Sequence, residues 1–322
     1  MIIVYREEEK KLTKTEYQDD ENFELEPGSW VHLKQPTPEL IEKVARMTSI
    51  SKDMLMCSLD EEESARIDND DGDTLIVLDT PYLENKEKSF YTTSPFLIAY
   101  NRSYYVTIQR HNFELMDELF RRVRVIEPHK HVRLTLNLVY RLATLFITYL
   151  KRINTYTESL ETSLRTSTKN EEVLALMDTN KSLIYFSTAL NANNGVLTKL
   201  TKSQSYKKYE SDFDLMEDAQ VEMSQAIEMC SISRNVLTSM MDAFASIINN
   251  NMNAVMKTLA ILTLVLSIPT LISSFMGMNF DDLPLDSEPW GFWFTVGISA
   301  ALSLIGAAIL IYVSRPHIKR RK

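Results

Sequence analysis

The chain has 322 residues, 25% of them charged and 44% hydrophobic, with a formal net charge of −9. The negative balance argues against nucleic acid as the main partner, because binding phosphates requires a basic face. The two cysteines, Cys57 and Cys230, are far apart and lack CxxC or Cys/His spacing, which excludes a disulfide framework and a structural zinc site and fits a reducing cytosol.

Residues 1–125 are predicted to form an α/β domain. β-rich runs occur at Ile2–Tyr5, Trp30–Leu33, Thr74–Leu78, Phe96–Tyr100 and Tyr104–Ile108, with helical segments at Thr37–Met47 and Phe113–Arg122. The acidic stretch Asp68–Asp73 does not fit a calcium-binding loop, because Ile67 and Leu78 fall where that loop needs carboxylates. We expect a hairpin turn at Asp71-Gly72 instead.

Residues 126–210 show apolar residues at helical spacing on both sides of Thr168–Asn170. This pattern predicts a long antiparallel helical hairpin. The first series is Leu134, Leu138, Leu142, Leu145, Tyr149, Leu160 and Leu164, and the second is Leu174, Met177, Leu183, Phe186, Leu190 and Leu197. Two histidines before the hairpin, His129 and His131, are more typical of solvated side chains than of a metal site.

Residues 211–257 are predicted to form a stalk helix that begins near Ser211-Asp212. Its apolar stripe consists of Leu215, Ala219, Met223, Ala226, Cys230, Ser233, Leu237, Met241, Phe244 and Ile248. No proline or glycine occurs from Asp212 to Ile268, so the stalk continues into the apolar segment that follows it. One helix of about 60 residues, or about 90 Å, results, and such a length needs partners along its side.

Two runs near the end of the chain carry no charge: Thr258–Phe280 has 23 residues and Trp290–Ser314 has 25. Each can cross a hydrocarbon core of about 30 Å as a helix, so a wholly soluble protein is excluded. We expect transmembrane helices at 258–278 and 291–314, a connecting loop at 279–290 and a tail at 315–322.

The charges around these two spans predict their orientation. The loop carries Asp281, Asp282, Asp286 and Glu288, whereas the tail carries Arg315, Lys319, Arg320, Arg321 and Lys322. By the positive-inside rule the tail is cytoplasmic, and with two spans the N-terminal part is cytoplasmic too. The first ten residues contain no apolar core typical of a signal peptide. We therefore expect a multi-pass protein of the cytoplasmic (inner) cell membrane with both termini inside.

One face of the first span is small or polar, apart from one methionine. Read at steps of three and four, it consists of Asn253, Met256, Ala260, Thr263, Ser267, Thr270, Ser274 and Gly277. Such a stripe lets two helices pack closely. Several copies in parallel would instead surround a wet axis with hydroxyl groups, and the long stalk favours that arrangement.

The end of this stripe, Gly277-Met278-Asn279, resembles the CorA family of divalent-cation channels. The resemblance also includes Asn253–Lys257 (NAVMK), Pro269 within the span, Leu283-Pro284 after it and Arg66 upstream of a β-hairpin. The order of α/β domain, helical hairpin, stalk and two spans fits as well. The fold class is thus an α+β membrane protein.

The resemblance implies a homopentamer whose five first spans line a pore for passive conduction of Mg²⁺, with Co²⁺ and Ni²⁺ as further cations. Selectivity would reside at Gly277, Met278 and Asn279, and the pore lining would be Asn253, Met256, Ala260, Thr263, Ser267, Thr270 and Ser274. Met256 and Leu259 would form the gate. Asp218 and Glu84 would bind regulatory Mg²⁺ between subunits. The partners would be other copies of the chain, membrane lipid and divalent cations, without an organic cofactor.

The chain departs from the family at two positions. Met276 precedes Gly277 where the family commonly has an aromatic residue, here displaced to Phe275, and Pro269 lies one position nearer the tripeptide. The pore register between Ser267 and Ser274 therefore stays open at this stage.

Two other functions compete with a magnesium channel. The zinc-handling branch of the superfamily commonly varies the middle residue of the tripeptide, so Met278 favours magnesium. A membrane-tethered sensor that conducts nothing would need no hydroxyl stripe, and no output domain is recognisable. The sequence has no GxGxxG, Walker A loop or HExxH and no nucleophile with a nearby base, so we expect no enzyme.

Overall fold

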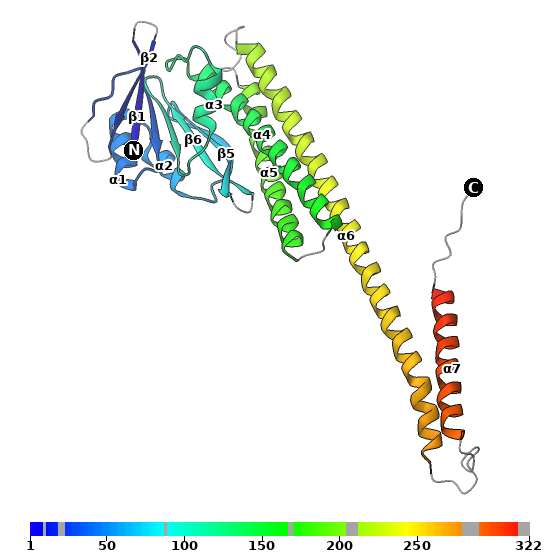
Figure 1. Ribbon diagram of the computed structural model, residues 1–322. Coiled ribbons are helices and arrows are strands. Elements are labelled where there is room, and N and C mark those ends of the chain that lie inside the picture. The colour runs from blue at the N-terminus through cyan, green and yellow to red at the C-terminus, as the bar shows by residue number, and fades with distance from the viewer. Residues whose placement is uncertain are drawn as a thin grey trace. The chain divides into compact units, whose positions relative to one another are not determined.

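The computed structural model describes residues 1–8, 11–18, 23–86, 89–166, 170–203, 212–278 and 290–314. The chain divides into two compact units, Met1–Met241 and Asp242–Lys322. The boundary falls inside the longest helix, α6 (Phe213–Met276). Figure 1 labels the elements of both units.

A seven-stranded sheet forms the core of the first unit. Its strands are β1 (Ile2–Glu8), β2 (Lys11–Tyr17), β3 (Trp30–Lys34), β4 (Arg66–Asp70), β5 (Asp73–Asn85), β6 (Phe90–Tyr100) and β7 (Tyr105–Gln109), in the order β2-β1-β3-β7-β6-β5-β4. Neighbours pair antiparallel, except that β3 and β7 are parallel. The parallel pair joins the N-terminal strands to the hairpins formed by β4–β7.

One face of the sheet packs against α1 (Pro38–Thr48), α2 (Lys52–Met56) and the 3-10 turn Cys57–Leu59. Alternate strand residues such as Val31, Leu33 and Val77 point to this side and are fully buried with the apolar face of α1. Helix α1 begins where the sequence favours it, because the Thr37 hydroxyl accepts a hydrogen bond from the Leu40 amide at 3.3 Å and proline follows Thr37.

The other face is covered by α3 (Leu115–Arg122), α4 (His131–Thr166) and α5 (Asn170–Lys202) (Figure 1). Two side chains of α5 bind the sheet through its backbone. The Asn193 side chain accepts from the Asp79 amide and donates to the Asp79 carbonyl, each at 2.8 Å, and the Ser182 hydroxyl accepts from the Tyr91 amide at 3.0 Å. The pairing of β4 with β5 ends at Val77. Beyond that point, the Asn193 side chain provides hydrogen-bond partners for the backbone amide and carbonyl of Asp79 on β5.

A buried polar cluster lies under α3 and α4. The Trp30 indole donates to the Thr107 hydroxyl at 2.8 Å, and His32 Nδ1 lies 2.9 Å from the same oxygen. His32 is 0% exposed, and burial lowers the pKa of its imidazole to about 3. The ring is therefore uncharged at neutral pH.

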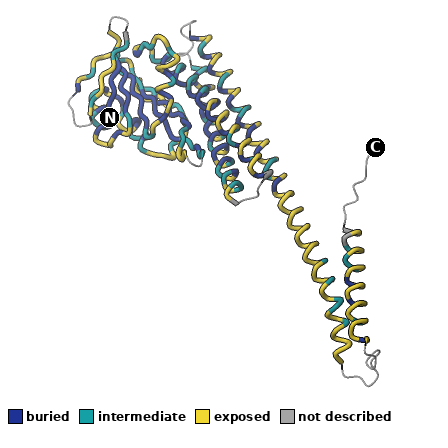
Figure 2. Tube along the Cα trace, in the orientation of Figure 1, coloured by how far each residue is buried: buried dark blue, intermediate teal, exposed yellow. Residues whose placement is uncertain are grey.

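Helix α6 packs along the α4/α5 hairpin within the first unit. The Cys230 thiol lies 3.5 Å from the Leu183 carbonyl, and the Thr144 hydroxyl lies 3.3 Å from Glu222 Oε1. The side that faces the hairpin is buried as the sequence predicts (Figure 2). Its buried members are Ala219, Met223, Ala226, Cys230, Ser233 and Leu237.

Most elements predicted from the sequence are confirmed. The turn at Asp71-Gly72 joins paired Asp70 and Asp73, and both turn residues have positive φ, 44° and 94°, as a two-residue hairpin requires. The single helix of about 60 residues is also confirmed, since α6 has 64. Arg66 is not upstream of the hairpin but is the first residue of its β4 strand.

Three predictions about side chains were wrong. Leu174 and Met177 are 59% and 54% exposed instead of buried in the hairpin, because α5 turns that side outward. His131 is not solvated: it packs against the rings of Tyr100 and Tyr105, and burial lowers its pKa to about 4.

Candidate functional site

Two helices in the described part of the chain are long and apolar enough to cross a membrane, α6 and α7 (Gly291–Ser314). In the most apolar stretch of each, only 0% and 11% of the residues are buried. The core helix of a soluble protein would be mostly covered. The exposed apolar surface therefore requires lipid or further protein.

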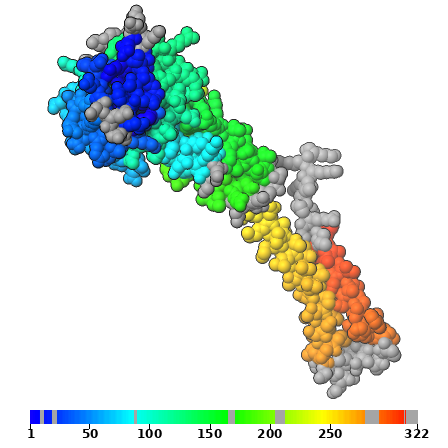
Figure 3. Space-filling model, turned by 60° about the vertical axis from the view of Figure 1, so that its left-hand side comes forward, coloured from blue at the N-terminus to red at the C-terminus, as the bar shows by residue number. Residues whose placement is uncertain are grey.

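Within the second unit, α7 lies beside the end of α6 (Figures 1 and 3). A Cβ atom added to Gly306 of α7 would lie 3.2 Å from Ile268 Cδ1, so the missing side chain allows the helices to approach. On the apolar half of α6 the half-buried residues share one side: Ile261, Val265, Ile268, Pro269 and Ile272. On α7 two small polar residues are buried, Ser299 and Ser303.

The stripe predicted to line a pore lies on the other side of α6. At about 100° per residue, its members are centred roughly opposite the half-buried side. All of them are exposed: Asn253, Met256, Ala260, Thr263, Ser267, Thr270 and Ser274. The stripe is therefore not used to pack α6 against α7 of the same chain.

The hydroxyl groups of this stripe are oriented by the helix itself. Thr263 donates to the Leu259 carbonyl at 2.9 Å, Ser267 to the Thr263 carbonyl at 2.7 Å and Thr270 to the Leu266 carbonyl at 2.9 Å. Each hydroxyl proton is thereby used, and the oxygen lone pairs remain for other partners. The stripe thus accepts hydrogen bonds. Water bound to a cation points its hydrogens outward, so this surface suits a hydrated cation.

The two residues predicted to gate the pore lie within one turn of α6. Met256 and Leu259 are 59% and 54% exposed. They are bulky and apolar beside the polar Asn253, so several parallel copies would form an apolar ring next to a polar one.

The predicted selectivity residues follow the end of α6. The Gly277 amide donates to the Ser273 carbonyl at 3.0 Å, and the Met278 amide donates to the Phe275 carbonyl at 3.3 Å, which closes the helix with a turn. A Cβ on Gly277 would lie 3.3 Å from the Ser273 oxygen, so the turn favours glycine. Asn279 lies outside the described residues, as do the acidic loop and the basic tail.

The structure exposes both predicted regulatory carboxylates, Asp218 on α6 and Glu84 near the end of β5. Among the described residues, no group of three or more His, Cys, Asp or Glu side chains could hold a metal ion. A site made from Asp218 and Glu84 would therefore need a second chain.

Sequence reasoning missed one acidic neighbour of Glu84. The pKa of Tyr82 is raised by burial, and Glu84 and Glu61 raise it further, so both carboxylates lie near this ring. Glu61 also pairs with Arg110 at 3.4 Å. The run of acids from Asp60 to Glu63 is the only signal that could have indicated it.

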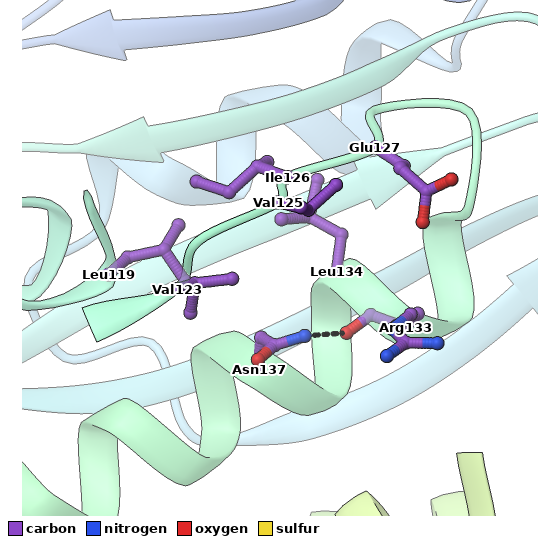
Figure 4. Close-up of a pocket in the computed structure, with 8 residues that line it drawn as sticks. All are labelled: Leu119, Val123, Val125, Ile126, Glu127, Arg133, Leu134 and Asn137. Carbon is purple, nitrogen blue, oxygen red and sulfur yellow. Dashed lines mark hydrogen bonds between the residues drawn. The ribbon is translucent and has the colours of Figure 1, made fainter. Parts of the chain in front are cut away.

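A small hollow lies between α3 and the start of α4 (Figure 4). Its walls are mixed, because apolar side chains such as Leu119 and Leu134 line it together with Glu127, Arg133 and Asn137. Asn137, at its edge, already donates to the Arg133 carbonyl at 2.9 Å. Glu127, the carboxylate of this lining, pairs with Lys130 at 2.8 Å, so the described lining offers no converging set of oxygen ligands such as a hard cation requires.

Comparison with known proteins identifies the family. Residues 27–319 match the family model described as CorA-like Mg²⁺ transporter protein. The chain belongs to this family. It is 28% identical over 302 residues to the cobalt/magnesium transport protein CorA of Methanocaldococcus jannaschii, covering 92% of this chain and 93% of that protein.

Solved structures agree with the family. The complete structure of the CorA magnesium transporter from Methanocaldococcus jannaschii superposes with a TM-score of 0.78 at 27% identity, covering 98% of each chain. The ZntB cytoplasmic domain from Vibrio parahaemolyticus has a TM-score of 0.59 at 12% identity, covering 77% of this chain and 98% of that one, and shares the fold alone. The CorA-like chain is thus an α+β protein with two apolar C-terminal helices.

Proposed function

We propose that the chain forms a homopentameric channel of the inner cell membrane for passive uptake of Mg²⁺, with Co²⁺ and Ni²⁺ as further cargo. The observation that carries this proposal is the hydrogen-bond-accepting stripe of α6. It faces away from α7 and leads to Gly277-Met278-Asn279. Five parallel copies would surround an axis lined with oxygen acceptors.

Self-association is supported by a second side of α6 in the first unit. Val221, Ile232 and Val236 are exposed, and they lie on neither the side buried by the hairpin nor the polar side. Exposed apolar residues along so long a helix favour a partner helix. Another copy of the chain, repeated round a closed ring, supplies that partner, and family resemblance makes the ring five-fold.

Selectivity in this proposal depends on holding the water shell of Mg²⁺. The ion gives up its water reluctantly, so a fast site binds the hydrated ion by outer-sphere hydrogen bonds. Five Asn279 amide oxygens and five Gly277 carbonyls would accept those bonds without a fixed charge, with Met278 between them. A ring of carboxylates would bind the ion more tightly and release it more slowly.

Gating in this proposal combines an apolar ring with a cytoplasmic sensor. Met256 and Leu259 would stop ions by excluding water from the constriction. Mg²⁺ shared by Asp218 and Glu84 of adjacent subunits would hold the closed assembly together, because it offsets repulsion between carboxylates. Both termini would lie in the cytoplasm, with the acidic loop outside.

The proposal predicts that Asn279→Ala abolishes Mg²⁺ uptake while assembly stays intact, because it removes one acceptor per subunit outside the helix packing. Complementation of a strain that lacks Mg²⁺ transport measures this. Normal growth of the variant on limiting Mg²⁺ would contradict the selectivity site. Uptake of Zn²⁺ in preference to Mg²⁺ by the unaltered protein would favour the zinc-transporting alternative.

A further inference from the structure

Three residues of the second unit, Trp290, Trp293 and Tyr312, combine a large aromatic ring with a polar N–H or O–H group. The sequence from Asp242 to Lys322 has no other tryptophan or tyrosine. Two of the rings lie at the start of α7 and the third lies near its end. They are 51%, 73% and 76% exposed, in the order given. Rings of this size are usually largely buried, so their exposure at both ends of one apolar helix favours a partner outside the chain.

Trp293 and Tyr312 project from the side of α7 that faces away from α6. At about 100° per residue, they lie about 140° and 120° round the helix from Gly306, the residue that approaches α6. Between them, the same side carries Leu304 and Ile305, which are 72% and 55% exposed. This side of α7 therefore has amphipathic rings at its two ends and apolar residues between them.

The spacing of the rings matches the thickness of a membrane. Trp293 and Tyr312 are 19 residues apart, which is about 28 Å along a helix. The hydrocarbon core of a bilayer is about 30 Å thick, and tryptophan and tyrosine are enriched at its two boundaries with water. There the ring lies among the acyl chains while its polar group reaches the headgroups and water. The two ends of α7 thus coincide with the two boundaries of the core.

The first charge outside the apolar half of α6 agrees with this depth. Gly306 and Ile268 lie at about the same level, because a Cβ on the glycine would meet the isoleucine side chain. Helix α7 runs back along α6 (Figure 1), so Tyr312 lies about 9 Å and Lys257 about 16 Å from that level in the same direction. Lys257 is therefore about 7 Å beyond Tyr312, at the depth of the headgroups and outside the hydrocarbon core.

The chain after Tyr312 is complementary in charge to one leaflet. Five basic residues follow within ten positions: Arg315, Lys319, Arg320, Arg321 and Lys322. Anionic phospholipid headgroups of a cytoplasmic leaflet attract basic residues next to a membrane span. A second copy of the chain packed on this side would give no reason for the polar rings to lie only at its two ends. Phospholipid accounts for both the rings and the charges.

We infer that this side of α7 binds phospholipid, with Trp290 and Trp293 anchored at the outer boundary of the hydrocarbon core and Tyr312 at the cytoplasmic boundary. The assignment of the two leaflets rests on the proposed function. The anchors also set the depth of α6, through the contact between Gly306 and Ile268.

The test measures quenching of tryptophan fluorescence by brominated phospholipids in vesicles that contain the full-length protein. Bromine quenches only nearby rings, so lipid brominated beside the headgroup reports the boundary, and lipid brominated near the chain ends reports the centre of the core. The variant Trp290→Phe/Trp293→Phe retains only the buried Trp30, whose emission is the baseline. Above that baseline, we expect the wild type to lose more emission to bromine beside the headgroup than to deep bromine.

Two further variants of this baseline protein compare depths on the same side of α7. Tyr312→Trp should show the wild-type pattern. Leu304→Trp is the matched control, because it places the same ring on the same side about 12 Å nearer the centre of the core. It should lose more emission to deep bromine.

Each other outcome contradicts one of the two proposals. Tyr312→Trp emission that is quenched equally by both lipids, or more by deep bromine, would overturn this inference. So would an absence of quenching at all three ring positions, because protein would then cover this side. Mg²⁺ flux is measured separately in vesicles of unbrominated lipid. Absent flux together with the expected quenching would contradict the proposed function and leave the anchors standing.

Discussion

Hydrogen bonding within α6 gives neighbouring polar residues different chemistry. Thr263, Ser267 and Thr270 use their protons on backbone carbonyls one turn earlier, which leaves oxygen lone pairs at the surface. The amides of Asn249 and Asn253 make no such bond within the described structure. A hydrated cation beside Thr263, Ser267 and Thr270 would meet hydrogen-bond acceptors. Composition alone does not reveal this, because a free hydroxyl donates as readily as it accepts.

Titration of a single buried histidine, His32, provides a prediction for the seven-stranded sheet. The pKa of His32 is about 3 in the folded protein and about 6.5 when unfolded, so the folded state binds fewer protons between these values. The stabilisation is complete above pH 6.5 and is lost as pH falls toward 3. His32→Gln should flatten the pH dependence of stability in this window.

Fluorescence of Trp30 can measure this stability, because its indole shares Thr107 with His32. Replacing Trp290 and Trp293 by phenylalanine leaves Trp30 as the only tryptophan. Denaturant unfolding at several pH values should show that stability changes less with pH in His32→Gln than in the wild type. Identical slopes in wild type and His32→Gln would contradict the assignment.

At the scale of elements, amphipathic periodicity was the reliable signal. The strands with apolar alternation and the long helices were predicted, whereas β2, β4 and α2 were not. Strands β2 and β4 are edge strands with mostly exposed polar residues, and α2 has only five residues, too few for a helical period. Leu174 and Met177 fit the helical period of apolar residues but are exposed. Periodicity identifies one face of a helix, but it does not show whether another element covers that face.

The contact of α6 with α7 predicts that the same substitution at two glycines of α7 changes stability differently. Gly306→Val should destabilise the helix pair by about 1–3 kcal/mol, because its side chain meets Ile268. Gly297→Val makes the same chemical change where no atom lies within 4 Å of the added Cβ, so stability should not fall. Thermal unfolding of the detergent-solubilised protein measures both. Equal melting temperatures for the two variants would show that the close contact between Gly306 and Ile268 does not hold the two helices together.

At the scale of the whole molecule, the proposed function depends on contacts that one chain cannot make. The sequence indicated the polar stripe of α6, whereas the exposed side of Val221, Ile232 and Val236 became visible only in the structure. In the proposed assembly, both sides would face other copies of the chain. The same limit applies to the regulatory pair. Asp218 and Glu84 are exposed and belong to no cluster of three ligands among the described residues.

Feedback by cytosolic Mg²⁺ gives a prediction at this scale. If the ion binds between subunits in the closed state, it stabilises that state by linkage. Asp218→Asn should then weaken the protection that Mg²⁺ gives against limited proteolysis, and it should shift inhibition of flux to higher internal Mg²⁺. Glu217→Gln, an equal loss of charge about 100° round the helix, is the control.

Native mass measurement on the same samples counts the subunits. Unchanged protection and unchanged inhibition in Asp218→Asn would remove this residue from the mechanism. A monomeric wild-type protein would contradict every contact proposed between subunits.

Movement of Mg²⁺ down its gradient through the purified protein tests the central claim most directly. The full-length chain is reconstituted into vesicles without nucleotide or any other energy source, and internal Mg²⁺ is followed after a gradient is imposed in either direction. We predict rapid flux that reverses when the gradient is reversed and stops when the concentrations are equal. Flux no faster than through protein-free vesicles would contradict the account.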